Sequence, residues 1–208
     1  MRAWIVWATG LLAYVVAVLD RTTLGVSGLA AADRFSTGPS LLSTFVVLQV
    51  VVYAGAQVPA GLLLDRFGSR AMIVAGAATM GSGQLVLAFT ESLPTAIAAR
   101  AVVGLGDAFT FISVLRLVPH WFAPRQIPLA TQLTGIFGQL GQVLSAIPFL
   151  ALLHAAGWSA AYVSAGALGV LSIVLTLLVV VDPRRFRRVD DPAVVDLVPG
   201  DLDFVDDA

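Results

Sequence analysis

The chain has 208 residues, of which 58% are hydrophobic and 12% are charged, and its mean hydropathy is +0.91. This composition excludes an ordinary water-soluble domain and is typical of a protein that crosses a membrane several times. The absence of Cys excludes disulfides, thiolate metal ligands and a cysteine nucleophile. The net charge of −1 is unevenly distributed, because residues 1–181 carry eight Arg and five acidic residues, whereas residues 182–208 carry four Arg and eight Asp. We therefore expect a membrane body over residues 1–181 and a polar tail over residues 182–208.

The first apolar segment runs from residue 3 to residue 19 and continues with small residues to residue 32, after the charged pair Asp20-Arg21. It is long enough to cross a bilayer, which takes about 20 residues. A secretory signal peptide is the rival interpretation, with Arg2 as its basic region and the alanines at 30–32 as a cleavage site. The length of the apolar run and the charged pair that interrupts it favour a membrane span. Further spans are expected at residues 40–64, 71–90, 95–118, 128–153 and 158–181.

The arginines fall unevenly on the two sides of this predicted bundle. With six crossings and a cytoplasmic N-terminus, only Arg34 lies on the outer side. The cytoplasmic side then holds Arg2, Arg66, Arg70, Arg125, Arg184, Arg185, Arg187 and Arg188. Cytoplasmic segments of membrane proteins carry an excess of Arg and Lys. The pattern predicts a multi-pass protein of the plasma (inner) membrane with both termini in the cytoplasm.

The loop expected at residues 61–70, between the second and third spans, packs three charges into six residues. Gly68 is free to adopt a positive φ in the turn, and Gly61 would allow close helix approach. Asp65 can lie at the loop entrance, while Arg66 and Arg70 would anchor the turn on the cytoplasmic side. Any short cytoplasmic hairpin favours a glycine and arginines, but that explanation does not account for the ordered spacing G-x3-D-R-x-G-x-R.

This spacing resembles the loop signature between the second and third spans of the major facilitator superfamily. The fourth predicted span contains Arg100-x3-Gly104-x-Gly106-Asp107-Ala108, which resembles the fourth-span motif of the same family. The stretch over residues 115–125 is similar to the family's connection into span 5. The resemblance covers residues 3 to about 188. It implies an all-α membrane protein with six transmembrane helices arranged as two inverted three-helix repeats, which is half of a major facilitator superfamily fold.

Charged residues inside the predicted spans are costly, at about 2.5–3.5 kcal/mol each near the bilayer centre, so they face a partner or a polar cavity. Arg100 and Asp107 lie on one face of the fourth span, separated by roughly 10 Å along the helix axis. The resemblance implies that Arg100 takes part in proton coupling, and Asp107 is the second coupling candidate. Arg116 lies nearly opposite and is expected to contact Asp65. An internal ion pair that only holds helices together is the alternative.

Arg21 lies near the middle of the first span, in the stretch Tyr14-x4-Leu19-Asp20-Arg21-x2-Leu24-Gly25. This stretch resembles the first span of the organic-anion and phosphate-ester branches of the superfamily. The resemblance implies that Arg21 contacts an anionic substrate. A guanidinium suits this role because it stays charged and can bind a carboxylate or phosphate through two hydrogen bonds. The alternative is that Arg21 only pairs with Asp107 or Asp20.

Polar stripes on two further spans favour a water-accessible cavity. Gln49, Tyr53 and Gln57 recur at intervals of four residues on the second span, and Gln142 lies on a polar stripe of the fifth. An uncompensated amide in lipid is costly. We therefore expect Arg21, Gln49, Tyr53 and Gln142 on the substrate side.

These observations predict a secondary transporter, and not an enzyme, that moves a small organic anion coupled to protons by alternating access. The expected partners are the lipid bilayer, the small-molecule substrate and protons; no cofactor, metal or nucleic acid is predicted. His120 and His154 are isolated near loops, and no phosphate-binding glycine loop is present. The predicted cytoplasmic gate consists of Gly61, Asp65, Arg66, Gly68, Arg70 and Arg116.

Two alternatives stay open. Drug–proton antiporters of the superfamily carry a Gly-Pro pair in the fifth span where this chain has Gly138-Gln139, a departure that argues against a drug exporter without excluding one. Six spans also lack the facing wall of a transport cavity. The chain would then be a truncated or half-size membrane protein that needs a second six-span half or a homodimer, or a non-transporting scaffold. The Asp-rich residues 182–208 are expected to form a cytoplasmic, disordered tail or the start of an interdomain linker.

Overall fold

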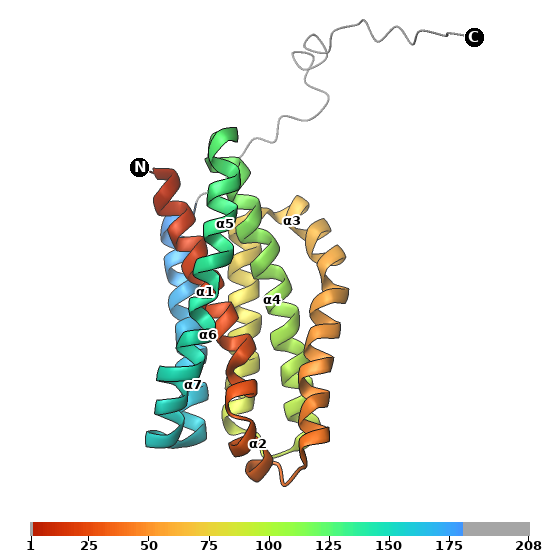
Figure 1. Cartoon of the computed structure of the whole chain (residues 1–208). Helices are drawn as coiled ribbons and strands as arrows, with labels where there is room; N and C mark the ends of the chain where they lie inside the picture. The colour runs from red at the N-terminus through yellow and green to blue at the C-terminus, as the bar shows by residue number, and fades with distance from the viewer. Residues whose placement is uncertain (1, 181–208) are drawn as a thin grey trace, which may run out of the picture.

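The computed structural model describes residues 2–180, which are helical along nearly their whole length (Figure 1). In chain order the elements are α1 (Arg2–Val26), α2 (Gly28–Arg34), α3 (Pro39–Phe89), α4 (Leu93–Trp121), the 3₁₀ turn η1 (Pro124–Gln126), α5 (Ile127–Gly138), α6 (Leu140–Leu144), the π-helical turn η2 (Ser145–Phe149) and α7 (Leu150–Val179). The tail expected at residues 182–208 lies outside the described residues.

Four helical segments are long and apolar enough to cross a membrane, which confirms the all-helical membrane class: Arg2–Val26, Ser40–Phe89, Leu93–Trp121 and Pro124–Val179. Two of them contain 50 and 56 residues. A straight helix of 50 residues would be about 75 Å long, more than twice the ~30 Å hydrocarbon core of a bilayer. These two segments are not straight, because α3 is broken at Gly68 (φ 82°, ψ 166°) and α7 at Gly157 (φ 84°, ψ 177°).

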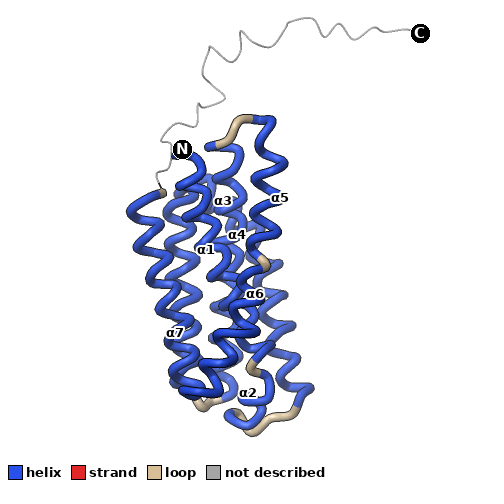
Figure 2. Tube along the Cα trace, turned by 60° about the vertical axis from the view of Figure 1, so that its left-hand side comes forward, coloured by secondary structure: helices blue, strands red, loops and turns tan. Residues whose placement is uncertain are grey.

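The chain reverses direction at both glycines, as the path of α3 and α7 shows in Figure 1. Each therefore has two helical limbs, residues 39–67 and 69–89 in α3 and residues 150–156 and 158–179 in α7. The first and last described residues lie at the same end of the bundle (Figure 2), where Val6 and Val180 share a hydrophobic cluster.

The positive φ predicted for Gly68 is confirmed. The hairpin is shorter than the predicted loop over residues 61–70, because the helical conformation continues on both sides of this one residue. The close helix approach predicted at Gly61 is wrong: a Cβ atom there would make an ordinary contact of 3.8 Å with Ile112. A single residue with a positive φ suffices to reverse the chain.

Some predicted boundaries also need correction. The first span was expected to run through residue 32, but α1 ends at Val26 and the separate short helix α2 follows. The fourth span extends beyond residue 118 to Trp121, although Pro119 lies inside its last turn. The fifth expected span is interrupted at Gln139 and by the π-helical turn η2, which contains Pro148. Proline lacks the N–H that an α-helix needs at this place, which favours a local departure from α-helical bonding.

Glycines bring the second limb of α3 into close contact with α4 and α7. A Cβ atom at Gly83 would lie 2.7 Å from Val103 Cγ2, and one at Gly106 would lie 2.6 Å from the carbonyl oxygen of Gly76. Toward α7, a Cβ atom at Gly169 would lie 3.3 Å from the carbonyl oxygen of Ala77. Contacts that move forward along α3 move backward along α4, so this limb is antiparallel to α4. Close approach of small residues is a common packing mode in membrane bundles.

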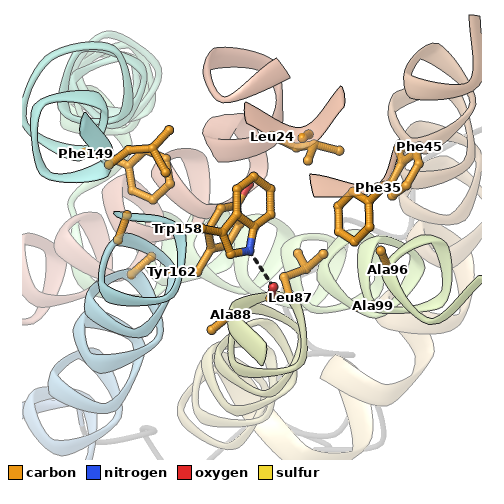
Figure 3. Packing of buried hydrophobic residues seen from close by; sticks show 14 of the residues in the cluster. Leu24, Phe35, Phe45, Leu87, Ala88, Ala96, Ala99, Phe149, Trp158 and Tyr162 are labelled. Atoms are coloured by element: carbon orange, nitrogen blue, oxygen red, sulfur yellow. Dashed lines mark hydrogen bonds between the residues drawn. The ribbon is translucent and has the colours of Figure 1, made fainter. Parts of the chain in front are cut away.

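The largest hydrophobic cluster lies at the end of the bundle opposite the termini. Figure 3 shows the packing of its side chains. The Trp158 ring stacks on Tyr162 with 4.3 Å between centroids and meets Phe35 edge-on at 5.8 Å. The Trp158 indole donates a hydrogen bond to the carbonyl oxygen of Leu87 at 2.7 Å. The Arg34 guanidinium lies 5.5 Å from the centre of the Trp158 ring, which adds a cation–π contact. These contacts connect α7 to α3 and to the end of α2.

We predict that Gly68→Ala destabilises the bundle by about 1–3 kcal/mol, because an alanine would have to adopt a backbone conformation that is nearly restricted to glycine. Gly55→Ala is the matched control: Gly55 lies in the first limb of the same helix with open space around its Cα, and alanine favours a helix. Thermal unfolding in detergent, followed by circular dichroism, measures both changes. Equal stability of the two variants would contradict the strained turn.

Candidate functional site

A cavity of about 590 Å³ lies between α1, the first limb of α3, α6 and η2. We call it the Arg21 pocket; its lining residues are Arg21, Thr22, Gly25, Val26, Val46, Gln49, Val50, Gln142, Val143, Ser145 and Ala146. Among these lining residues Arg21 is the charged one, and the others are apolar, small or neutral polar. The volume lies within the range of about 300–1,000 Å³ that is common for small-molecule sites. The pocket therefore suits a small molecule that carries a negative charge.

Arg21 connects this pocket to a buried carboxylate on α4. Its Nη1 donates to Oδ2 of Asp107 at 3.2 Å. The Asp107 side chain has no exposed surface, whereas the Arg21 side chain is 29% exposed. The other oxygen of Asp107, Oδ1, is buried without a hydrogen-bond partner. A guanidinium has five N–H donors, so Arg21 can hold Asp107 and still offer donors to an anion in the pocket.

Arg100 is buried and is held by uncharged acceptors. Its Nη1 donates to the main-chain oxygen of Asp20 and to Oγ1 of Thr23, both at 3.3 Å. Its Nη2 donates to the main-chain oxygen of Arg21 at 2.7 Å and to Oε1 of Gln49. Within residues 2–180, neither ion pair involves Arg100. Arg100 and Asp107 thus hold different groups of α1, and α4 contacts the middle of α1 through both of them.

Asp20 and Gln84 complete this polar core. Both side chains are buried, and Gln84 Nε2 donates to the main-chain oxygen of Asp20 at 2.9 Å and to Oγ1 of Thr23 at 3.3 Å. Oδ1 of Asp20 and Oε1 of Gln84 are both buried without a hydrogen-bond partner. A buried acceptor without a donor is costly. A proton on the Asp20 carboxyl would supply a donor where both oxygens lack one.

The four residues predicted on the substrate side lie around Arg21 to different degrees. Gln49 lines the pocket, but its amide oxygen is bound by Arg100 and its Nε2 lies 3.4 Å from the main-chain oxygen of Arg21. Gln142 lines the pocket from the opposite side, and its exposed amide contacts Gln139. Tyr53 is not among the lining residues, but it is close enough to Arg21 to interact electrostatically. The structure thus brings Arg21, Gln49 and Gln142 together around one cavity.

The residues predicted for a cytoplasmic gate lie at the end of the bundle where α3 reverses. The expected contact between Arg116 and Asp65 is present as an ion pair. Nη2 of Arg70 donates to the carbonyl oxygen of Leu177 at 2.6 Å, which ties the α3 turn to the last turn of α7. The Arg66 guanidinium lies over the neighbouring Phe67 ring. This end of the bundle is held by contacts between the α3 turn, α4 and α7.

Sequence reasoning missed several members of the site. Gln84 is a lone amide in an otherwise apolar span, and the cost of an amide in lipid that drew attention to Gln49 applies to it equally. Thr22 lines the pocket beside Arg21 and donates to Ser145 at 2.9 Å. Tyr14 interacts electrostatically with Arg21; it belongs to the first-span stretch that carries the resemblance around Arg21, but the resemblance implies no role for it. Among the described residues, no group of three or more His, Cys, Asp or Glu could hold a metal ion.

Comparison with known proteins shows the family. The model of the Major Facilitator Superfamily matches residues 10–199, and the chain belongs to this family. A protein of Cupriavidus necator named "Probable sulfoacetate transporter SauU" is 25% identical over 80% of this chain and 38% of its own length. The "Probable galactarate/D-glucarate transporter GudP" of Bacillus subtilis is 28% identical over 83% of this chain and 39% of its own length.

A third relative, the "Multidrug efflux pump LfrA" of Mycolicibacterium smegmatis, is 28% identical over 92% of this chain and 37% of its own length. The chain therefore spans less than two-fifths of the length of these relatives. The relatives include transporters named for organic anions and one named for drug efflux.

We predict that Arg100→Lys destabilises the bundle, because a single ammonium cannot reach the acceptors that Nη1 and Nη2 bind separately. Each buried acceptor left without a donor costs about 1–3 kcal/mol. Arg125→Lys, in the exposed turn η1, is the control and should leave the free energy of unfolding nearly unchanged. The two variants are compared by thermal or denaturant unfolding in detergent. Equal stability of the two variants would show that the separate hydrogen bonds of Nη1 and Nη2 of Arg100 are not needed for stability.

Proposed function

We propose that this chain forms the anion-binding part of a secondary transporter, which moves a small organic anion coupled to protons by alternating access. The observation that supports this most is the position of Arg21, which is exposed to a pocket on one side and bound to the fully buried Asp107 on the other. The names of the organic-anion relatives point to the same substrate class.

Anion binding is coupled to proton binding because the anion and Asp107 share one guanidinium, that of Arg21. An anion that binds Arg21 competes with Asp107 for its N–H donors. A buried carboxylate without a paired cation is strongly disfavoured, so Asp107 takes up a proton when the anion displaces it. Arg100 keeps the neighbouring turn of α1 in place during this exchange. Asp20, whose Oδ1 lacks a donor, is a further proton-binding candidate beside Asp107.

We propose that the four apolar segments make six membrane spans, because α3 and α7 each fold back at a glycine. The contacts between α1 and the α5–η2 segment are, in order, Trp7 with Thr134, Tyr14 with Gly138, and Thr22 with Ser145. The contacts between the first limb of α3 and α4 are Gln49 with Gly104, Gly61 with Ile112, and Asp65 with Arg116. Both pairs of helices are parallel. The first pair consists of spans 1 and 5, and the second of spans 4 and 2. A two-fold rotation that exchanges spans 1, 2 and 3 with spans 4, 5 and 6 therefore converts the first pair into the second, as inverted repeats require.

The two turning glycines also support this symmetry. Gly68 joins spans 2 and 3 and Gly157 joins spans 5 and 6, and their backbone angles are nearly the same. Within the described residues, Arg66, Arg70, Arg116 and Arg125 lie toward the end that contains Arg2, whereas Arg34 lies at the other end. This distribution favours a cytoplasmic N-terminus in the plasma membrane. The contacts of Asp65 and Arg70 at that end would then hold a cytoplasmic gate.

The open side of the Arg21 pocket requires a covering partner in the membrane, because an exposed guanidinium in lipid is costly. A second six-span half or a second copy of this chain would supply the missing wall. A drug exporter is the second candidate function, favoured by the similarity to LfrA. The charged Arg21 in the pocket argues for an anion over a cationic drug.

We expect Arg21→Gln to reduce anion binding and uptake roughly 10- to 100-fold, the loss of a charge-assisted hydrogen bond. Sulfoacetate, D-glucarate and tartrate are the test anions, measured by uptake into proteoliposomes and by stabilisation against thermal unfolding. Arg125→Gln is the control for the loss of a positive charge outside the pocket. Binding that is unchanged in Arg21→Gln would remove Arg21 from the substrate site.

We expect Asp107→Asn to separate anion movement from proton movement, because an amide cannot take up the proton that the displaced carboxylate would bind. Proteoliposomes with an inward proton gradient should accumulate the anion with the wild-type protein and fail to do so with the variant. Exchange of anion against anion, which needs no net proton movement, should continue. Full proton-driven accumulation in the variant would exclude Asp107 as the coupling residue.

A further inference from the structure

Tyr14, on α1 like Arg21, packs between α4 and α5. Its ring is 5% exposed and lies 5.3 Å, centroid to centroid, from the ring of Phe111 on α4. Its hydroxyl is close enough to the Arg21 guanidinium to interact with it electrostatically. Tyr14 lies two helical turns before Arg21 on α1, which brings it to the same side of the helix.

Gly138 on α5 lies against the Tyr14 ring. A Cβ atom at Gly138 would collide with the edge of the Tyr14 ring, with 2.8 Å to Cδ1 and 3.2 Å to Cζ. The ring of Tyr14 therefore lies where the side chain of any other residue at position 138 would have to be. Gly135, one turn earlier on α5, has no atom within 4 Å of such a Cβ. Gly138 is buried against the Tyr14 ring at the end of α5, whereas Gly135 is exposed.

Arg21 needs such a support because Asp107 pulls its guanidinium away from the pocket. The ion pair draws Nη1 toward a carboxylate with no exposed surface. The hydroxyl of Tyr14 is an uncharged group near the guanidinium, and an anion in the pocket would not compete with it by charge. Such a group would keep the guanidinium in place both when Asp107 is bound and when an anion displaces it.

We propose that Tyr14 is a positioning residue that presents the Arg21 guanidinium to the pocket, and that Gly138 is required because it leaves room for the Tyr14 ring. This inference rests on the proposed role of Arg21 as the anion-binding group. It adds a residue from the hydrophobic core and a glycine from α5 to the determinants of anion affinity.

The test uses a thiol as a reporter of positive charge in the pocket. The chain contains no Cys, so Val143→Cys places the single thiol of this chain on the pocket wall. The full chain, reconstituted in liposomes, is treated with 2-sulfonatoethyl methanethiosulfonate, which is anionic, and with ethyl methanethiosulfonate, which is neutral. The ratio of the two reaction rates reports how strongly Arg21 attracts an anion. Tyr14→Phe, Gly138→Ala, Gly135→Ala and Arg21→Gln are each combined with this reporter.

We expect the rate ratio to fall in Arg21→Gln and, by roughly two- to tenfold, in Tyr14→Phe and Gly138→Ala, the range of one net hydrogen bond. Gly135→Ala should match the reporter alone. In uptake of the test anion that the wild-type protein transports, Tyr14→Phe should raise KM with little change in kcat. Tyr14→Phe keeps the ring, so folding is preserved even where Gly138→Ala lowers stability.

Three outcomes would overturn the proposal in distinguishable ways. A ratio that falls in Arg21→Gln and is unchanged in Tyr14→Phe overturns the positioning role and leaves the proposed anion site intact. A ratio that is unchanged in Arg21→Gln shows that Arg21 does not act on the pocket, which overturns the proposed function and this inference together. Equal effects of Gly135→Ala and Gly138→Ala would show that the glycine acts through helix propensity and not through Tyr14.

Discussion

The burial of Arg100 is the constraint on which the rest of this bundle depends. A guanidinium inside a membrane protein must find acceptors for its N–H groups or remain at a high cost. Nη1 and Nη2 of Arg100 meet this need with main-chain oxygens of α1, a threonine hydroxyl of α1 and the amide of Gln49 on α3, while Nε is buried without a hydrogen-bond partner. These acceptors come from two helices besides its own. These hydrogen bonds can form only when α1, α3 and α4 are correctly aligned. Arg100 therefore disfavours any other register of the three helices.

The glycines of the fourth span serve this arrangement. A Cβ atom at Gly104 would lie 3.1 Å from Cγ of Gln49 and 3.3 Å from its main-chain carbon. Glycine at this position lets the first limb of α3 approach α4 until the amide of Gln49 reaches Arg100. Gly106, two residues later, faces the second limb of α3, where a Cβ atom would lie 2.5 Å from Cγ of Met80. The two glycines of the motif thus open two sides of α4, one for each limb of α3.

Much of this organisation could be predicted from the sequence, because the signals involved are local. Apolar length gave the spans, ordered spacing gave the turn at Gly68, and charges in apolar segments marked Arg21, Arg100 and Asp107. The contact between Arg116 and Asp65 followed from their placement at one end of neighbouring spans. Pairing of Arg21 with Asp107 was one of two alternatives that the sequence left open, and the structure contains that ion pair. The acceptors of Arg100 were not predictable, because no pattern in the sequence indicates that main-chain oxygens would bind it.

The roles proposed for Tyr14 and Gly138 could not be inferred from the sequence for a related reason, since they depend on a contact between helices that are far apart in the chain. A tyrosine among apolar residues is indistinguishable from core packing, and the glycines at 135 and 138 look equivalent on one helical stripe. Only the arrangement of α1 against α5 shows that one glycine faces a ring and the other faces open space. The short π-helical turn beside the pocket was likewise not predicted, although Pro148 marks the segment in which it occurs.

The two buried arginines differ in what a ligand can change. Each acceptor of Arg100 belongs to the protein and is uncharged, and the residue is 1% exposed, so no ligand in the pocket can replace its contacts without separating the helices. Arg21 is 29% exposed and holds one charged partner, Asp107, that an anion can displace. Under the proposed coupling, arrival of an anion would alter the protonation of Asp107 while the contacts of Arg100 keep α1, α3 and α4 aligned. In that mechanism a fixed charge and an exchangeable one are separated, so that a bound anion would change the electrostatics of the core without destabilising it.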